Sequence, residues 1–476
     1  MLAIIIKIYF TLNIFQQAYY GFDLYFKWVK KHFWIINLLL PLELVIYLFS
    51  HPVLYLIVFL LEIFYFYLYY RHEKKHLKFT KRVFRISLLI LLLCVILILI
   101  IPSFIIYMIV DLLLILAVFC LKPIEYLINK KYLNKASKKI TNVKAKKIAI
   151  TGSYAKTSVK NFCAHILSKK YLVKSTPKSY NTPLGISKFI NENDFNMTDF
   201  IIYEFGARHP NDIKELRELF AYDIAIVTEV GLMHLDTFGS VLNILKTKMD
   251  LLAGLSKDGI AILNFENELI RNYQVDNYNI ISYGFNYGNY QAKNLSLGLE
   301  KSSFDLYVNG IYKGSYQTHL VGRHNILNLL PAIIMCDLFQ IDYHEIENIQ
   351  AVSNRLSYQR INDFKLLLDA YNSNLVGATN ALEIVKNEKQ NRYIITPGFV
   401  ECDIEMEVLA QEYAKAINES VDYCFLIENK FTNLMKKMII IDVKLFKTFK
   451  EAYASFLNEH PKDATLLIEN DWLDVY

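Results

Sequence analysis

The feature that most constrains the fold of this 476-residue chain is a largely apolar stretch, built mainly from Leu, Ile, Val, Phe and Tyr, over residues 33–121. A helix of about 20 apolar residues crosses the hydrocarbon core of a bilayer. Proline-containing breaks, "SHP" at 50–52 and "IPS" at 101–103, and a basic segment over 71–82 divide the stretch into four segments near that length. The stretch therefore predicts an all-α region of four transmembrane helices, with expected bounds 33–50, 52–70, 84–101 and 103–121.

Basic side chains lie in three clusters, before the first expected span, between the second and third, and after the fourth, all on the same side of the expected bilayer. Because loops rich in Lys and Arg stay in the cytoplasm, the clusters predict a multi-pass protein of the cytoplasmic membrane whose residues after 122 are cytoplasmic. The alternative is a buried helical core, which an apolar surface all around the helices disfavours. The clusters are Lys27, Lys30 and Lys31; Arg71, Lys74, Lys75, Lys78, Lys81 and Arg82; and Lys122, Lys130 and Lys131.

The residues that flank or interrupt the apolar stretch need separate interpretations. Residues 1–32 mix apolar and polar positions and are expected to form an interfacial segment, and residues 123–145 are expected to form a linker. Glu43, Glu62 and Asp111 would lie near mid-membrane, where acids are costly. They are either functional, or protonated or bonded to tyrosines inside the bundle, and the sequence leaves both interpretations open.

The net charge indicates which class of molecule the chain binds, and the cysteines indicate whether it has disulfides or a zinc site. The net charge of +6 is modest and lies largely beside the apolar stretch, so membrane lipid rather than nucleic acid is the expected partner. The six cysteines are scattered and include no CxxC pair, which argues against a disulfide framework or a zinc site.

From Lys146 onward, short apolar strands alternate with stretches of helical spacing. The strands "KKIAIT", "DFIIYEFG", "YDIAIVTEV" and "GIAILNFEN" form a first series. A second series, "KLLLDAYNSN", "RYIITPGF", "DYCFLIEN" and "ATLLIEND", begins near residue 355. This alternation predicts the α/β class, with parallel sheets covered by helices on both faces. We expect two such domains, 146–350 and 351–476, after the membrane region.

The stretch "ITGSYAKTSVK", residues 150–160, follows the first of these strands and opens a helix. This is the context of a phosphate-binding loop, in which backbone N–H groups at a helix N-terminus receive phosphate. Lys156 would reach the β- and γ-phosphates of a nucleotide, and Thr157 would bind Mg²⁺. Ala155 stands where such loops usually have glycine, and an alanine in left-handed geometry costs about 1–2 kcal/mol. The expected ATP-binding residues of the loop are Thr151, Gly152, Ser153, Tyr154, Ala155, Lys156, Thr157 and Ser158.

The loop resembles that of the Mur ligase family, whose pattern is T-G-x-x-G-K-T/S, and two later segments extend the resemblance. "YEFGARHPNDI" places Glu204 at the carboxyl end of a strand, where open α/β sheets bind their ligands. "GLMHLDTFGSVLNILKTKMDLL" holds His234 and, fourteen residues later, Lys248, at the spacing of the family. The resemblance implies that Glu204 and His234, with Thr157, are Mg²⁺ ligands. It also implies that Lys248 is carbamylated and that its carbamate helps to hold a second Mg²⁺.

Further segments resemble later landmarks of the same family. "GRHNILN" implies that Asn325 and Asn328 meet the adenine of ATP. "NRL" and "DAYNSN" resemble the opening of the third family domain, so that Arg355 would contact phosphate and Asp369 would bind ATP. The residues expected to face the substrate are Asn181 and Thr182 in "SYNTPLGIS", and Tyr371, Asn372 and Asn374 in "DAYNSN".

The resemblance implies a P-loop Mur ligase central domain, a Rossmann-like C-terminal domain, and an activity. The family transfers the γ-phosphoryl of ATP to a carboxylate, and an amine then attacks the acyl phosphate to give an amide. Lys156 and two Mg²⁺ ions would offset the charge of the approaching anions. The "GSYxKTS", "EFGAR" and "AYNSN" features look most like the branch that joins a UDP-muramoyl tripeptide to D-Ala-D-Ala in peptidoglycan precursor synthesis.

Two other interpretations stay open, because the apolar region stands where the family normally has a soluble UDP-binding domain. In the first, the same chemistry acts on a lipid-linked or polymeric acid, as in poly-γ-glutamate synthesis. In the second, the chain is a non-catalytic membrane scaffold, which Ala155 motivates and which Glu204, His234 and Lys248 oppose, since all three stand at family spacing. Other cell-wall enzymes are candidate partners of the membrane helices.

Overall fold

The chain divides into two compact units, residues 1–131 and residues 132–472, in the computed structural model of the protein. Each unit is described by itself. The structure describes residues 2–18, 20–31, 37–49, 51–72, 76–178, 180–231, 233, 235–275, 278–351, 356–361, 363–369, 375–389, 391–399, 406–459 and 462–469.

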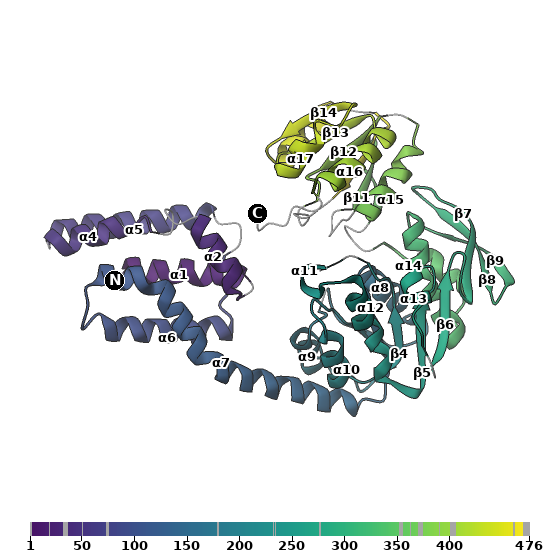
Figure 1. The fold of residues 1–476 in the computed structure, drawn as a ribbon, viewed down its shortest axis with the longest axis horizontal. Helices are drawn as coiled ribbons and strands as arrows, with labels where there is room; N and C mark the ends of the chain where they lie inside the picture. Colours follow the sequence, from purple (N-terminus) through teal and green to yellow (C-terminus); the bar gives the residue numbers. More distant parts are fainter. Residues whose placement is uncertain are drawn as a thin grey trace. The chain divides into compact units, whose positions relative to one another are not determined.

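The first unit is helical throughout its described part (Figure 1). Helix α1 lies in its interior, since eleven of its sixteen residues are buried. The expected interfacial segment over 1–32 is therefore wrong for α1. The physical reason is that apolar residues lie all around α1 and favour burial, while its buried Lys7 and Thr11 are bonded to Asp111. The helices are α1 (Leu2–Gln17), α2 (Phe22–Lys31), α4 (Leu40–Phe49), α5 (Pro52–His72), α6 (Lys81–Leu97) and α7 (Ser103–Thr141).

The observed helices follow the expected spans only in part. Among the described residues, α5 and α7 are long and apolar enough to cross a membrane, a test of length and composition that a buried core helix also passes. The first expected span, 33–50, lies partly outside the described residues, and α4 begins at Leu40. Most of the linker expected over 123–145 is helical. Helix α7 continues through Pro123 to Thr141, because Leu, Lys, Ala and Glu in this segment are good helix formers.

Asp111 is bonded inside the helical unit. Its carboxylate forms an ion pair with Lys7 Nζ at 3.2 Å and accepts hydrogen bonds from Thr11 Oγ1 at 3.2 Å and from the hydroxyl of Tyr25. For Asp111 the interpretation as a group bonded within the bundle is therefore confirmed, tyrosine partner included. Glu62 is buried, and the side chain of Glu43 lies outside the described residues.

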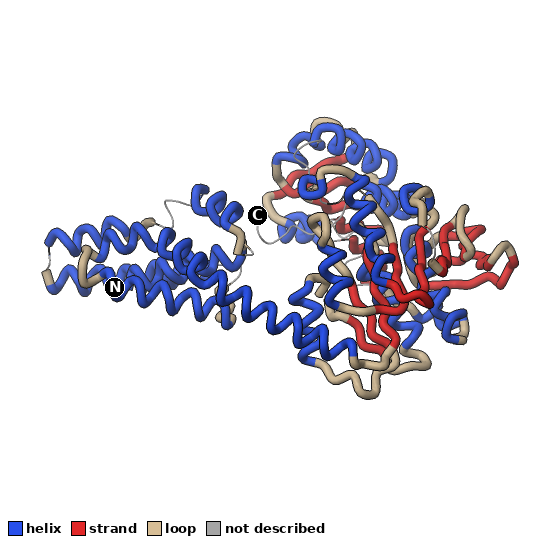
Figure 2. Tube along the Cα trace, turned by 60° about the horizontal axis from the view of Figure 1, so that its bottom comes forward, coloured by secondary structure: helices blue, strands red, loops and turns tan. Residues whose placement is uncertain are grey.

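The first sheet of the second unit has nine strands in the order β2-β3-β1-β4-β5-β6-β7-β8-β9. Figure 2 draws the strands of the chain in red. Neighbouring strands from β2 to β7 are parallel, and β7, β8 and β9 form an antiparallel extension. The strands are β1 (Lys146–Thr151), β2 (Val173–Ser175), β3 (Phe200–Glu204), β4 (Tyr222–Val227), β5 (Leu255–Asn264), β6 (Asn279–Gly284), β7 (Tyr290–Ser296), β8 (Ser302–Val308) and β9 (Ile311–Thr318).

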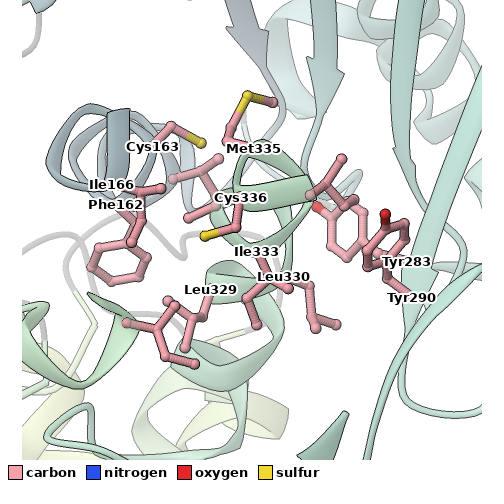
Figure 3. Close-up of a cluster of buried hydrophobic side chains, with 14 of the residues drawn as sticks. Phe162, Cys163, Ile166, Tyr283, Tyr290, Leu329, Leu330, Ile333, Met335 and Cys336 are labelled. Carbon is pink, nitrogen blue, oxygen red and sulfur yellow. The ribbon is translucent and has the colours of Figure 1, made fainter. Parts of the chain in front are cut away.

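Helices cover both faces of this sheet because successive side chains of a strand point to opposite faces. Ile148 and Ile150 of β1 belong to a core with α8 and α14, whereas Ala149 belongs to a core with α9, α10 and α12. Figure 3 shows the first core, where Phe162 and Cys163 of α8 lie near side chains of α14. The helices are α8 (Lys156–Leu167), α9 (Pro183–Glu192), α10 (Asp212–Leu219), α11 (Leu235–Phe238), α12 (Val241–Met249), α13 (Glu268–Arg271) and α14 (Arg323–Phe339).

The second sheet has the order β10-β11-β15-β12-β13-β14 and is parallel except for the β10–β11 pair. The α/β class and the presence of two such domains are thus confirmed, and the chain passes between the sheets around residue 350, where the sequence predicted the boundary. The elements are β10 (Ser357–Ile361), β11 (Phe364–Asp369), α15 (Leu375–Lys386), β12 (Arg392–Thr396), α16 (Met406–Ser420), β13 (Tyr423–Ile427), α17 (Lys430–Met435), β14 (Asp442–Phe446), α18 (Phe449–Asn458) and β15 (Thr465–Glu469).

Candidate functional site

The candidate site lies where β1, β3 and β4 end. In the parallel ladders Ile150 pairs with Glu204 and Thr151 pairs with Val227. The loop that follows β1, the last residue of β3 and the loop that follows β4 therefore meet at the carboxyl edge of the sheet. Open α/β sheets bind ligands at this edge.

The loop between β1 and α8 is braced by the segment after β4. Ser153 N donates to Glu229 O at 2.6 Å, and Gly231 N donates to Ser153 Oγ at 3.1 Å. Thr228 Oγ1 donates to the carbonyls of Thr151 at 3.1 Å and Tyr154 at 2.6 Å. These bonds fix the loop backbone before any ligand binds, as a phosphate-binding loop requires.

Ala155 adopts the left-handed conformation that the sequence predicted for this position. Its φ is +65° and its ψ is −6°, and it precedes α8 without a side-chain cap. The loop therefore keeps the backbone shape of its glycine-containing counterparts at the cost of strain in one residue.

We expect Ala155→Gly to stabilise the protein. Left-handed alanine costs about 1–2 kcal/mol, glycine loses about 0.5–1 kcal/mol more backbone entropy on folding, and the net gain is about 0.5–1 kcal/mol. Urea denaturation measures it. Ala164→Gly, within α8, is the matched control and should lower stability by about 1 kcal/mol, because its backbone is helical. If both variants lose stability, the strain assigned to Ala155 is wrong.

Lys156 and Thr157 open α8 and face the loop and the neighbouring strand. Lys156 Nζ donates to Gly152 O at 2.7 Å and to Ser153 O at 3.1 Å, so its ammonium group lies against the loop. Thr157 Oγ1 donates to Glu204 Oε2 at 2.9 Å. Two residues that the sequence predicted as Mg²⁺ ligands are thus in direct contact.

Glu204 is the centre of a buried polar cluster and is 1% exposed. Besides Thr157, it accepts hydrogen bonds from Lys160 Nζ at 3.1 Å on Oε2 and from Asn181 Nδ2 at 3.2 Å on Oε1. The structure therefore places Asn181 beside the predicted metal ligand. The hydroxyl of Thr182 caps α9 by accepting from Gly185 N at 3.2 Å.

Lys160 is the residue of this cluster that the sequence analysis missed. The available signal was its spacing, because it follows Lys156 by one helical turn and so lies on the same side of α8. Its partner Glu204 is 44 residues away along the chain. Helical spacing alone could not distinguish a buried lysine from a solvated one.

Lys248 is 2% exposed within α12. Its Nζ donates to Ala207 O at 3.4 Å and lies 5.9 Å from the centre of the Phe238 ring. Burial, with the nearby charge of Lys156, holds the pKa of the Lys248 amine well below its usual range, although Asp212 opposes the shift. A neutral amine is the form that reacts with CO₂, and a carbamate would be an anion near Lys156, so this site fits the carbamate.

The expected adenine-binding residues lie at the start of α14. Asn325 is buried and its Nδ2 donates to Val321 O at 2.8 Å, while Asn328 is half-buried one turn later. Arg323 stacks its guanidinium 4.4 Å from the centre of the Phe285 ring. Burial lowers the pKa of His324 to about 4, so this imidazole is neutral at physiological pH.

The remaining predicted residues belong to the second sheet or are not described. Asp369 ends β11 and accepts a hydrogen bond from Leu356 N at 3.2 Å. Among the described residues no group of three or more His, Cys, Asp and Glu side chains could hold a metal ion. The predicted site residues outside the described part are His234, Arg355, Tyr371, Asn372 and Asn374.

A family match and individual relatives of this chain all point to Mur ligases. Residues 150–336 match the family described as Mur ligase middle domain. The UDP-N-acetylmuramoyl-tripeptide–D-alanyl-D-alanine ligase of Escherichia coli (strain K12) is 30% identical over 291 residues, which cover 58% of this chain and 63% of that protein. The ligase of the same name from Borreliella burgdorferi is 26% identical over 324 residues, covering 65% and 68%. The chain thus spans less than two thirds of the E. coli relative.

A solved structure has the same fold over most of this chain. The MurF ligase from Thermotoga maritima in complex with ADP superimposes with a TM-score of 0.66 and 18% sequence identity, covering 73% of this chain and 81% of that one. At this identity the likeness concerns the fold alone.

Proposed function

We propose that this chain, whose residues 150–336 match the Mur ligase middle domain, is an ATP-dependent amide ligase that joins a UDP-muramoyl tripeptide to D-Ala-D-Ala. The observation that carries the proposal is the contact between Thr157 of the phosphate loop and the buried carboxylate of Glu204. The E. coli and B. burgdorferi relatives bear the name of this activity, and the T. maritima structure that shares the fold holds ADP.

The residues of the site have complementary tasks in this reaction. The loop N–H groups and Lys156 bind and orient the phosphates of ATP. Thr157 and Glu204 would hold one Mg²⁺, and carbamylated Lys248 would help to hold a second. When bound, these ions neutralise the charge that builds up as a carboxylate approaches the γ-phosphoryl group. No side-chain nucleophile is required, since the amine substrate attacks the acyl phosphate directly.

Phosphate release tests this proposal. The detergent-solubilised full chain receives ATP, Mg²⁺, UDP-muramoyl tripeptide and D-Ala-D-Ala, and mass spectrometry identifies the product. Release that needs both substrates and yields the pentapeptide supports the proposal. Lys156→Ala should lower the rate by about 10²–10³-fold, because it removes a charge that stabilises the transition state. Lys169→Ala is the matched control, since Lys169 forms a half-exposed ion pair with Glu345 away from the loop.

A second candidate substrate is a lipid-linked or polymeric acid, and the helical unit favours it. Only 11% of the 18-residue apolar segment of α5 and 33% of that of α7 are buried within the structure. The core helix of a soluble protein would be mostly buried. Large apolar side chains such as Leu60, Leu92 and Leu112 are exposed on three of its helices. Formation of product from such an acid, with no release from UDP-muramoyl tripeptide, would favour this candidate.

We also propose that this unit anchors the protein in the cytoplasmic membrane. The full chain should stay in the membrane pellet after extraction with alkaline carbonate, because burying its exposed apolar surface in lipid is strongly favourable. Leu60→Lys should weaken this retention, since a lysine at mid-membrane costs about 2.5–3.5 kcal/mol. Release of the unmodified chain into the supernatant contradicts the anchor.

A further inference from the structure

Lys160 is a buried cation that the proposed reaction does not use. Its side chain is 1% exposed and its ammonium group is 3.1 Å from Glu204 Oε2. The same group donates to the carbonyl of Lys178 at 2.5 Å. Removing an ammonium group from water is costly unless partners replace the lost hydration. A buried lysine at this position therefore suggests a role other than filling space in the core.

Lys160 and these partners belong to three separate parts of the candidate site. Lys160 itself lies on α8, directly behind the phosphate loop, and Glu204 ends β3. The carbonyl of Lys178 belongs to the segment between β2 and α9, which leads to Asn181. A single ammonium group thus connects the helix that follows the phosphate loop, the predicted metal ligand and the predicted substrate-facing segment.

Other hydrogen bonds make this connection continuous. Glu204 N donates to Thr176 Oγ1 at 3.2 Å, where the segment leaves β2. At its other end, Gly206 N donates to Asn181 O at 2.8 Å and Asn181 Nδ2 donates to Glu204 Oε1. Thr176 and Asn181, at the two ends of the segment, are therefore both bonded to residues where β3 ends. Between them, Lys160 is bonded to the carbonyl of Lys178.

We propose that Lys160 is a positioning residue that sets the orientation of the Glu204 carboxylate and couples it to the segment bearing Asn181. Lys160 and Thr157 occupy Oε2, so Oε1 is the oxygen that faces away from α8 toward Asn181. Groups behind a metal ligand fix its direction, and their removal typically costs about 10–100-fold in metal affinity or activity. The kinetic part of this inference rests on the proposed ligase function, whereas the structural part does not.

The test compares Lys160→Met with Lys147→Met in the full chain. Lys147 is a matched control because it is also buried in the same domain and donates to backbone carbonyls, those of Val143 and Ala145, at the opposite end of β1. Both variants lose a buried ammonium group. Only Lys160→Met is expected to lower kcat, by about 10–100-fold, and to raise the KM for the carboxylate substrate, with ADP affinity in the absence of Mg²⁺ unchanged.

Hydrogen exchange provides a readout that needs no activity. Peptides that cover residues 173–190 should exchange faster in Lys160→Met than in Lys147→Met. Equal exchange and equal kinetics in the two variants would overturn the proposal and leave Lys160 as a purely structural lysine. If the unmodified protein releases no phosphate with these substrates, the proposed function fails, but the exchange comparison still decides the role of Lys160.

A double variant keeps the inference testable if Lys160→Met folds poorly. Removing one partner of a buried ion pair leaves the other charge uncompensated, whereas removing both does not. Lys160→Met combined with Glu204→Gln should therefore unfold at a higher temperature than Lys160→Met alone. If the loss of stability in the double variant equals the sum of the losses in Lys160→Met and Glu204→Gln, the two side chains are not coupled. That result would overturn the proposal.

Discussion

Replacing Lys248 with methionine is expected to reduce the proposed ligase activity by about 10²–10³-fold, because the chain loses a group that would hold Mg²⁺ at the developing charge. Methionine has a similar length and suits a side chain that is 2% exposed, so the fold should persist. ADP binding to the phosphate loop should also persist, since Lys248 makes no hydrogen bond to that loop. Phosphate release and calorimetry with ADP measure the two properties separately.

The matched control is Lys246→Met, because Lys246 is exposed on the same helix. It should retain full activity. Loss of activity in both variants, or full activity in Lys248→Met, would contradict the role assigned to Lys248.

The pH dependence of the same site has a definite direction. Burial and the charge of Lys156 lower the pKa of Lys248, so its amine is neutral at a pH where an ordinary lysine is protonated. Only the neutral amine forms a carbamate, so activity should fall as the pH falls through this lowered pKa. Added bicarbonate should restore activity in CO₂-depleted buffer, and NMR with ¹³C-bicarbonate should detect a carbamate signal that Lys248→Met lacks.

The second large effect is expected for Gly152→Ala, which should abolish nucleotide binding. Gly152 has a φ of +151°, and a Cβ atom there would lie 2.0 Å from Thr228 Oγ1 and 3.0 Å from Glu229 N. Thr228 cannot move away freely, because its hydroxyl donates to the carbonyls of Thr151 and Tyr154. Overpacking and backbone strain together should cost about 2–5 kcal/mol. Urea denaturation and calorimetry with ADP measure the two effects.

Gly310→Ala separates the clash from backbone strain. Gly310 also has a positive φ, +79°, but a Cβ atom there would meet nothing within 4 Å, and it lies in the turn between β8 and β9. This variant should lose only about 1 kcal/mol and should bind ADP normally. Equal ADP affinity in the two variants would show that the close packing of Gly152 does not shape the nucleotide site.

The phosphate loop could be predicted because its features are local. A strand, a glycine and a lysine that opens a helix follow one another within eleven residues, and the backbone preferences of those residues act over the same short distance. The strain at Ala155 was predictable for the same reason, since the loop shape demands a positive φ at that position. Glu204 was found because it ends a strand, and parallel strand ends meet at one edge of a sheet.

Sequence spacing could not predict the burial and the partners of the lysines in the site. The sequence indicated Lys248 through its distance from His234, but the lowered pKa of its amine depends on the packing of α12 against the rest of the domain. The spacing of Lys160 from Lys156 was too weak a signal, because a lysine one turn into an amphipathic helix is usually solvated. The ladder between β1 and β3 brings Glu204 to it and so makes it a buried ion pair.

Residue order alone thus specified the elements of this protein: the apolar helices, two series of α/β units and the loop that is expected to receive phosphate. These depend on hydrophobic period and backbone preference, which act between residues a few positions apart. Only the folded chain decided that α1 is enclosed by other helices, that α7 runs to Thr141, and that Lys160 and Asn181 share one carboxylate. Burial and side-chain partners depend on which distant segments pack together, and strand register and helix packing set this over the whole domain.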